Sequence, residues 1–265
     1  MNNAYSCYTF QYFLDSAEAL GLTRIDLWGG VQHFDPYCAE TRCAALKRQL
    51  TERGMSVVAY TPEILAYPYN IAAEDREVRT ASVAYIERNI VTAVRMGVSV
   101  MLVSPGWGVW DQPEEEARKW SMDSLASLAR TAEVCGIRLA LEHLTIQSSN
   151  LLHCVSDVQK MVSAIGNPYF GAALDLGQMS VFGERVSDYF QALGDKIFIV
   201  HMMDGQPGGH LAFGDGILPL EDYYAQLQEF GYQGPITLEI NDGRYARNPH
   251  RAVEQCIRAL QGWEG

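Results

Sequence analysis

Short runs of apolar residues alternate with longer amphipathic segments along the whole chain. Short apolar runs are typical of buried strands, whereas apolar residues at every third or fourth position indicate helices. The pattern predicts strands at residues 5–10, 24–28, 56–60, 98–103, 138–142, 172–175, 197–201 and 235–239. It also predicts intervening helices, the clearest at residues 13–20, 41–53, 75–96 and 113–135.

Several of the predicted helices are followed by glycine, as at Gly54, Gly97 and Gly136. Helices commonly end at a residue in the left-handed conformation, which glycine adopts without strain. Near-continuous apolar strands that alternate with helices imply a parallel sheet covered by helices. Eight such units in 265 residues predict an α/β fold, a single (β/α)8 TIM barrel domain over residues 1–265. No Gly-x-Gly-x-x-Gly motif follows the first predicted strand, which argues against a dinucleotide-binding fold.

The composition and net charge indicate a folded protein and disfavour some classes of binding partner. A hydrophobic fraction of 48% is sufficient for a large core. The net charge of -12 disfavours nucleic acid and anionic membranes as partners. No apolar run reaches the ~18 residues of a membrane span, and no signal-peptide pattern opens the sequence. The six cysteines form no CxxC pair, so reduced thiols in a cytoplasmic protein are expected.

The last four predicted strands each end in an ionisable residue. These residues are Glu142, Asp175, His201 and Glu239, spaced by 33, 26 and 38 positions. One strand–helix unit of an eight-unit barrel of this length would take about 33 residues, and barrel enzymes place their chemistry at the carboxyl ends of the strands. One such residue alone is more often a helix cap or a structural contact. Four in consecutive units predict a divalent-cation site.

Three carboxylates and one imidazole suit Mn²⁺ best, with Co²⁺, Mg²⁺, Ni²⁺ or Zn²⁺ as alternatives. A cation in this position stabilises the negative oxygen of an enediolate, which forms when a proton leaves carbon beside a carbonyl. Glu142 and Glu239 end the fifth and eighth predicted strands. They are therefore expected to approach a planar intermediate from different sides, as acid and base.

Longer segments resemble the xylose isomerase-like TIM-barrel sugar isomerases and epimerases, and within them the fructoselysine 3-epimerase-like branch. The resemblance covers essentially the whole chain, and its most specific segments are residues 60–63 (Tyr-Thr-Pro-Glu) and 67–70 (Tyr-Pro-Tyr-Asn). It implies a metal-dependent epimerase that inverts C3 of a ketose or ketosamine of the fructoselysine or psicoselysine type. It also implies that Glu142, Asp175, His201 and Glu239 hold the metal, and that Glu142 and Glu239 exchange the C3 proton. Barrels of this kind often form dimers or tetramers, so a homo-oligomer is expected.

The chain departs from better-known ketose 3-epimerases at three positions that contact substrate hydroxyls in that branch. It has Gln178 in place of His, Pro207 in place of Arg and Ser148 in place of Glu. The resemblance therefore favours a modified sugar over a simple free ketohexose.

Other polar and aromatic residues follow the predicted strands and are candidates for substrate contact. The candidate substrate-binding residues are Trp28, His33, Glu63, Trp107, Gln178, His210 and Asp215. Each also has a structural interpretation, as a core side chain, a cap or part of a surface turn. Tyr67 and Tyr69 are expected to pack within a loop.

Several alternative functions use a similar scaffold. Another sugar isomerase, of the aldose–ketose or hydroxypyruvate type, would need the same cation. An inosose-type dehydratase would expel a hydroxyl instead of returning a proton. A repair endonuclease would need more histidines and a basic groove, and a non-catalytic barrel would bind sugar without turnover.

Overall fold

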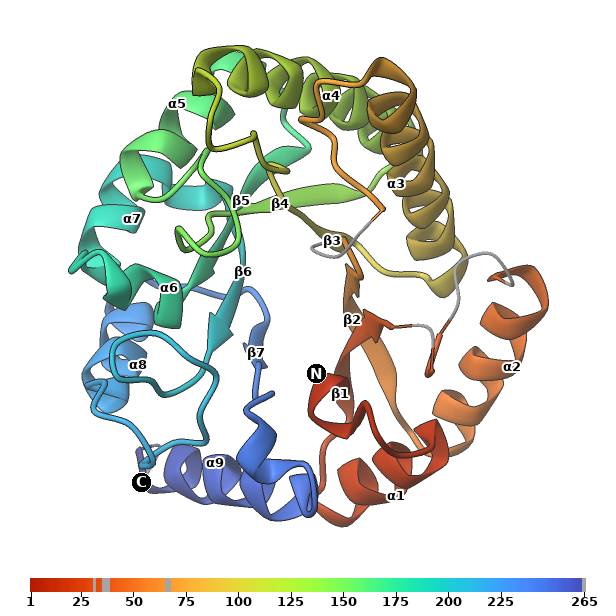
Figure 1. Ribbon diagram of the computed structural model, residues 1–265. Coiled ribbons are helices and arrows are strands. Elements are labelled where there is room, and N and C mark those ends of the chain that lie inside the picture. The colour runs from red at the N-terminus through yellow and green to blue at the C-terminus, as the bar shows by residue number, and fades with distance from the viewer. Residues whose placement is uncertain (31, 35–38, 65–67, 264–265) are drawn as a thin grey trace.

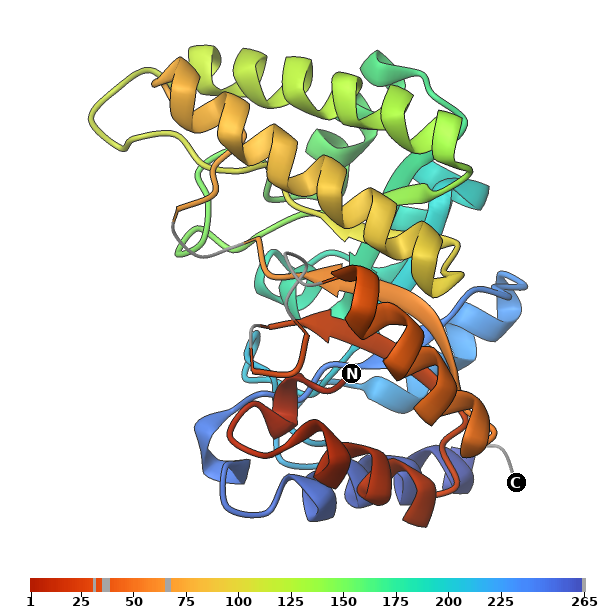
Figure 2. The same ribbon diagram turned by 90° about the vertical axis from the view of Figure 1, so that its right-hand side faces the viewer.

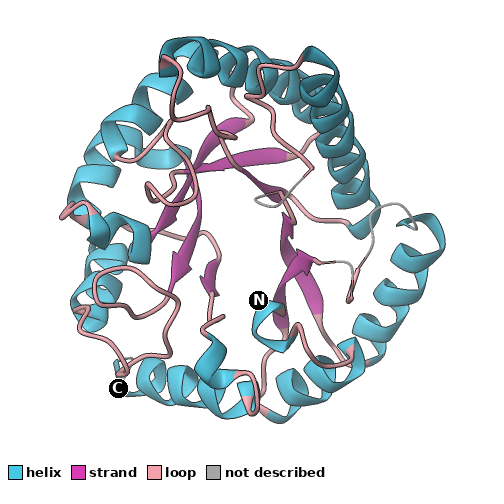
Figure 3. Ribbon diagram, in the orientation of Figure 1, coloured by secondary structure: helices cyan, strands magenta, loops and turns pink. Residues whose placement is uncertain are grey.

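The computed structural model describes residues 1–30, 32–34, 39–64 and 68–263. In these ranges seven parallel strands pair in sequence order and form a nearly closed barrel inside a ring of helices (Figure 1, Figure 3). The strands are β1 (Arg24–Gly29), β2 (Ser56–Pro62), β3 (Val100–Val103), β4 (Arg138–Glu142), β5 (Phe170–Asp175), β6 (Ile197–Met202) and β7 (Ile236–Leu238). The predicted TIM-barrel fold is thereby confirmed.

The helices lie before β1 and after each of the strands along the chain. They are α1 (Phe10–Ala19), α2 (Ala39–Glu52), α3 (Arg76–Met96), α4 (Glu114–Cys135), α5 (Val155–Ile165), α6 (Leu176–Val181), α7 (Val186–Leu193), α8 (Leu220–Glu229) and α9 (Pro249–Trp263). Figure 2 shows the loop between β3 and α4 extending beyond the barrel at the left, the end at which the strands terminate. In the described ranges no helix is both long and apolar enough to cross a bilayer. Tyr67 lies outside the described residues.

The local sequence explains where α3 and α4 begin and end. The Asp75 side chain accepts hydrogen bonds from the backbone of Glu77 and Val78 and so caps the start of α3. Gly97 ends α3 at φ 76° and Gly136 ends α4 at φ 69°, both in the left-handed region. The predicted helix stops at these two glycines are confirmed.

The predicted strand at residues 5–10 is wrong. Asn3–Tyr5 forms a short 3-10 helix, and α1 already begins at Phe10. The Thr9 hydroxyl caps α1 by accepting a hydrogen bond from the backbone N–H of Tyr12. The aromatic run therefore starts a helix, and the seven strands of the described chain begin at Arg24.

Alternation along the strands separates two apolar cores. Side chains two residues apart on a strand point to the same face. A small cluster of Ala59, Val100, Leu102, Ala140, Ala173, Phe198 and Ile199 is distinct from the large cluster that the helices cover. Ala140, Ala173 and Ile199 each precede an ionisable residue by two positions. The same alternation therefore brings Glu142, Asp175 and His201 to one end of the barrel interior.

Candidate metal centre and active site

Four ionisable side chains meet at the carboxyl ends of the strands. Glu142 ends β4, Asp175 ends β5, His201 lies in β6 and Glu239 follows β7. Each offers one ligand atom, and these atoms all lie within 4.8 Å of one another. Glu142, Asp175 and His201 are buried, and the side chain of Glu239 is 16% exposed. The structure thus brings together the four residues that the sequence singles out.

The spacing of these atoms fits the coordination shell of a divalent cation. Nδ1 of His201 lies 3.0 Å from Oε1 of Glu142 and 2.9 Å from Oε2 of Glu239. Ligands at right angles around an ion with bonds of ~2.1 Å are about 3.0 Å apart. Among the described residues, Nδ1 of His201, Oε1 of Glu142 and Oδ2 of Asp175 have no hydrogen-bond partner. Buried polar atoms are rarely left unpaired, and a cation bound between these three atoms would give each of them a partner.

The electrostatics of the cluster also favour an added positive charge. Burial raises the pKa of Glu142. Burial, reinforced by the charges of Glu142 and Glu239, raises the pKa of Asp175 to about 7. Burial would raise the pKa of Glu239 as well, but the charge of His201 lowers it to about 2. Two buried carboxylates and the partly buried carboxylate of Glu239, with one imidazole, carry excess negative charge, which a divalent cation would neutralise.

Asp26 is a residue of this site that the sequence analysis did not single out. Its buried carboxylate accepts hydrogen bonds from Thr61 and from Thr237, each at 3.0 Å. Oδ2 of Asp26 also lies 3.6 Å from Nε2 of His201. The sequence feature that could have identified Asp26 is its place between two apolar residues, in the segment Ile25-Asp-Leu27. A charged side chain within a buried strand needs polar partners, so such a residue is a candidate for a site.

Gln178 is placed beside the cluster by the start of α6. Asp175 caps this helix, and its Oδ1 accepts a hydrogen bond of 2.7 Å from the backbone N–H of Gln178. The side-chain Oε1 of Gln178 is buried without a partner among the described residues. An unpaired acceptor in this position can receive a hydrogen bond from a ligand hydroxyl.

His210 reaches the cluster from the loop after β6. Its Nδ1 lies 3.2 Å from the carbonyl oxygen of Glu239 and 4.0 Å from Oε2 of the same residue. Burial would lower the pKa of His210, but the carboxylates of Glu239, Asp175 and Glu142 raise it above its usual value. The His210 side chain is 31% exposed, so it lies between the cluster of ionisable residues and the solvent.

Trp28 and Glu63 form a pair on adjacent strands. Nε1 of Trp28, in β1, donates a hydrogen bond of 3.1 Å to Oε2 of Glu63, which follows β2. Both side chains are partly exposed at the end of the barrel where the strands terminate. Trp107 also lies at this end, after β3, where its backbone N–H and C=O bind the Asn70 side chain.

Two further candidates for substrate contact, His33 and Asp215, make hydrogen bonds within the protein. Nδ1 of His33 contacts the side-chain amide of Asn2 at 2.9 Å, and Nε2 contacts the Tyr8 carbonyl at 2.9 Å. Asp215 accepts hydrogen bonds from Tyr245 at 2.5 Å and from Gln255 at 2.9 Å. These contacts tie His33 to the amino-terminal segment and Asp215 to the segment around α9. Neither residue joins the ionisable cluster.

The parallel barrel, with four ionisable residues at the carboxyl ends of its strands, has the architecture of a TIM-barrel enzyme. The chain matches the Xylose isomerase-like TIM barrel family over residues 14–263 and belongs to that family. It is 30% identical to the fructoselysine 3-epimerase of Shigella flexneri over 252 residues, which are 94% of this chain and 91% of that protein. The resemblance predicted from the sequence is thereby confirmed, and it places the chain among isomerase-type enzymes.

Solved structures of low sequence identity share the fold. A D-psicose 3-epimerase crystallised with D-fructose has a TM-score of 0.79 at 15% identity, over 97% of this chain and 93% of that chain. The IOLI protein with a bound zinc atom has a TM-score of 0.81 at 19% identity, over 98% of this chain and 95% of that chain.

Proposed function

We propose that this protein is a divalent-cation-dependent 3-epimerase that inverts C3 of a ketosamine of the fructoselysine type. The observation that carries the proposal is the approach of Glu142 and Glu239 to one focus from different strands, 3.0 and 2.9 Å from the same nitrogen of His201. Figure 1 shows β4 and β7 on different sides of the barrel. The identity to a fructoselysine 3-epimerase over 94% of the chain supports the same activity.

Epimerisation requires a proton to leave one face of C3 and another to arrive on the opposite face. Glu142 and Glu239 supply a carboxylate on each side, so one acts as base while the other acts as acid, and the roles reverse with the entering epimer. Asp175 and His201 complete the ligand set. When bound, a divalent cation, in our proposal Mn²⁺, supplies a positive charge that stabilises negative charge on the substrate oxygens.

The residues around the cluster support a modified sugar as substrate. Oε1 of Gln178 is an acceptor for a sugar hydroxyl. Glu63 places a partly exposed carboxylate at the barrel mouth, suited to a cationic amine on the substrate. The net charge of -12 also favours a neutral or cationic substrate over a sugar phosphate.

The test is to incubate Mn²⁺-loaded protein with fructoselysine and, separately, with D-fructose in heavy water, and to follow C3 by NMR. We expect the C3 epimer of fructoselysine to appear with deuterium at C3, faster than any product from D-fructose. A conjugated product with new ultraviolet absorbance would identify a dehydratase instead. Conversion to an aldose would identify an aldose–ketose isomerase.

A further inference from the structure

The loop between β6 and α8, residues 203–219, is built around one buried carboxylate. The side chain of Asp204 is 2% exposed and accepts hydrogen bonds from four backbone N–H groups of the loop. These donors are Gly205 at 2.8 Å and Leu218 at 3.0 Å on Oδ1, and Gly214 at 2.8 Å and Gly216 at 3.0 Å on Oδ2. Because charged acceptors make strong hydrogen bonds, Asp204 ties the start of the loop to its end.

Two further features hold this loop in one arrangement. A side chain at Gly216 would collide with Oδ1 of Asp204, and one at Gly205 would collide with the carbonyl oxygen of Gly208. Asp204 also pairs with Leu211 through two backbone hydrogen bonds of 2.9 Å. This pair fixes the backbone directly beside residue 210.

The loop presses His210 against the segment that carries Glu239. The carbonyl oxygen of His210 accepts hydrogen bonds of 3.3 Å from the N–H groups of Asn241 and Asp242. Its Nδ1 lies 3.2 Å from the carbonyl oxygen of Glu239. A carbonyl oxygen can only accept, so Nδ1 carries a proton and donates it to this bond.

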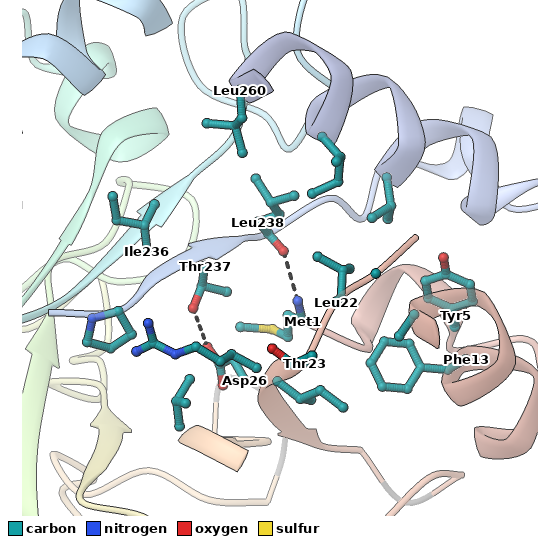
Figure 4. A pocket seen from close by; sticks show the side chains of 18 of the residues that line it. Met1, Tyr5, Phe13, Leu22, Thr23, Asp26, Ile236, Thr237, Leu238 and Leu260 are labelled. Carbon is teal, nitrogen blue, oxygen red and sulfur yellow. Dashed lines mark hydrogen bonds between the residues drawn. The ribbon is translucent and has the colours of Figure 1, made fainter. Parts of the chain in front are cut away.

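Other contacts fix the strand that leads to Glu239. In the described chain β7 pairs only with β6, and Figure 4 shows the Thr237 hydroxyl of β7 bonded to Asp26. The N–H of Glu239 binds the Met202 carbonyl at 3.2 Å. With His210 on its own carbonyl, Glu239 is held through both backbone groups. The distance between the His210 ring and Glu239 is therefore set by the protein and does not depend on a bound substrate.

The second ring nitrogen of His210 remains for a ligand. Nε2 has no hydrogen-bond partner among the described residues, and the side chain is 31% exposed. The charges of Glu239, Asp175 and Glu142 all act on the ring, which places it beside the ionisable cluster. A hydroxyl group both donates and accepts, so it can pair with Nε2 whether or not this nitrogen carries a proton.

The proposed reaction indicates which substrate hydroxyl this is. Glu239 is one of the two carboxylates proposed to exchange the proton of C3, so C3 must lie next to it. The oxygens on C2 and C3 take part in the reaction itself, and C1 carries the amine of a ketosamine. The nearest remaining hydroxyl is on C4, one bond from C3. Nδ1 of His210 is 4.0 Å from Oε2 of Glu239, so the ring is close enough to reach a group on a carbon next to C3.

We propose that His210 determines substrate specificity by a hydrogen bond from its Nε2 position to the C4 hydroxyl of the ketosamine, and that Asp204 is the positioning residue that holds His210 there. The inference rests on the proposed function, because C4 is chosen from C3 as the reacting carbon. Asp204 does not touch the substrate. Its substitution should therefore act through the loop alone.

The test compares fructoselysine with 4-deoxyfructoselysine on the Mn²⁺-loaded protein. Calorimetry gives the affinity for each sugar, and deuterium incorporation at C3 gives KM and kcat. We expect the deoxy sugar to bind about 5–10-fold more weakly to the unaltered protein, the effect of one lost hydrogen bond. Its kcat should stay within about twofold of that for fructoselysine, because the lost contact is remote from the transferred proton.

Two substitutions separate the roles of the ring nitrogens of His210. The amide nitrogen of asparagine can take the place of Nδ1, and that of glutamine can take the place of Nε2. His210→Asn should therefore keep the contact with Glu239 and bind the two sugars equally. His210→Gln should still prefer fructoselysine.

Asp204→Asn tests the positioning role. Asparagine offers one oxygen where the carboxylate offers two, so amide hydrogen exchange at Gly214 and Gly216 should speed up about tenfold or more. The preference for fructoselysine should disappear, with the loss in KM rather than in kcat. The control is Asp195→Asn, at an exposed aspartate in the short 3-10 helix η3 (Gly194–Lys196), which should keep both the exchange rates and the preference.

An equal preference for fructoselysine in the unaltered protein and in His210→Asn would overturn the inference. Equal affinity of the unaltered protein for the two sugars would overturn it as well. The proposed function fails in a different way, through the absence of deuterium at C3 in the unaltered protein. A preference that His210→Asn abolishes would support the C4 contact even then, because calorimetry measures it without turnover.

Discussion

Oδ2 of Asp26 lies 3.6 Å from Nε2 of His201, the ring nitrogen opposite the one that faces Glu142 and Glu239. Thr61 and Thr237 hold the Asp26 carboxylate in place from β2 and β7. A carboxylate at Nε2 favours the tautomer with its proton there and leaves the Nδ1 lone pair for a cation. We infer that Asp26 orients His201 as a ligand.

Replacing Asp26 by asparagine is expected to weaken Mn²⁺ binding by about 10–100-fold, because outer partners of this kind fix the ligand orientation. Isothermal titration calorimetry with Mn²⁺ measures the affinity directly. Asp188→Asn, which changes a carboxylate paired with Arg185 on the surface, is the matched control and should bind as the unaltered protein does. Unchanged affinity in Asp26→Asn would exclude the orienting role.

The two-carboxylate scheme predicts that Glu239→Gln lowers epimerase turnover by about 10²–10⁴-fold, the usual contribution of a general acid or base. Glutamine keeps one oxygen ligand, so Mn²⁺ binding must be measured in the same sample to separate lost chemistry from lost metal. Glu229→Gln, at the exposed end of α8, is the control. Full turnover in a metal-loaded Glu239→Gln protein would rule out a proton-transfer role for Glu239.

Gln178 is predicted to bind substrate without holding the cation. Gln178→Ala should raise the KM for the ketosamine about 5–10-fold, the effect of one lost hydrogen bond of ~1 kcal/mol, and leave Mn²⁺ affinity unchanged. The control is Gln159→Ala, because Gln159 lies on α5 and donates only to the Ala192 carbonyl among the described residues. A KM equal to that of the unaltered protein would remove Gln178 from the substrate site.

The stability of the protein should fall at high pH through Cys256. Burial raises the pKa of this thiol to about 12, from an ordinary value near 9. The unfolded chain therefore loses the thiol proton first, so the stabilising contribution is complete below pH 9 and disappears as the pH rises towards 12.

Urea unfolding between pH 8 and pH 11 tests this expectation. The free-energy difference between the unaltered protein and Cys256→Ala should shrink by up to about 1.4 kcal/mol per pH unit above pH 9. Cys7→Ala, which removes an exposed cysteine, is the matched control variant. A constant difference for Cys256→Ala would contradict the burial argument.

The four residues of the ionisable cluster could be predicted from sequence because each stands at the end of an apolar run. Strand alternation then fixes which face each side chain occupies, so Glu142, Asp175 and His201 had to meet if the strands were parallel neighbours. Asp26 obeys the same alternation, but it lies inside its strand. A search for ionisable residues at the ends of apolar runs therefore does not find it.

The amino-terminal region shows where sequence reasoning fails. The apolar residues of 5–10 fit a strand by composition, yet Thr9 caps a helix whose apolar residues Phe13, Leu14 and Ala17 pack into the core. Capping and tertiary packing outweighed the aromatic content. The hydrogen bonds of His33 to Asn2 and Tyr8 likewise join residues far apart in the sequence, and such contacts leave no local pattern in it.

The central claim is that Glu142, Asp175, His201 and Glu239 hold one divalent cation. Anomalous diffraction from a crystal grown with Mn²⁺ tests it most directly. The account predicts one strong anomalous peak within ~2.0–2.6 Å of a ligand atom from each of the four residues. A peak at another place, or four side chains that turn away from a common centre in the presence of Mn²⁺, would contradict it.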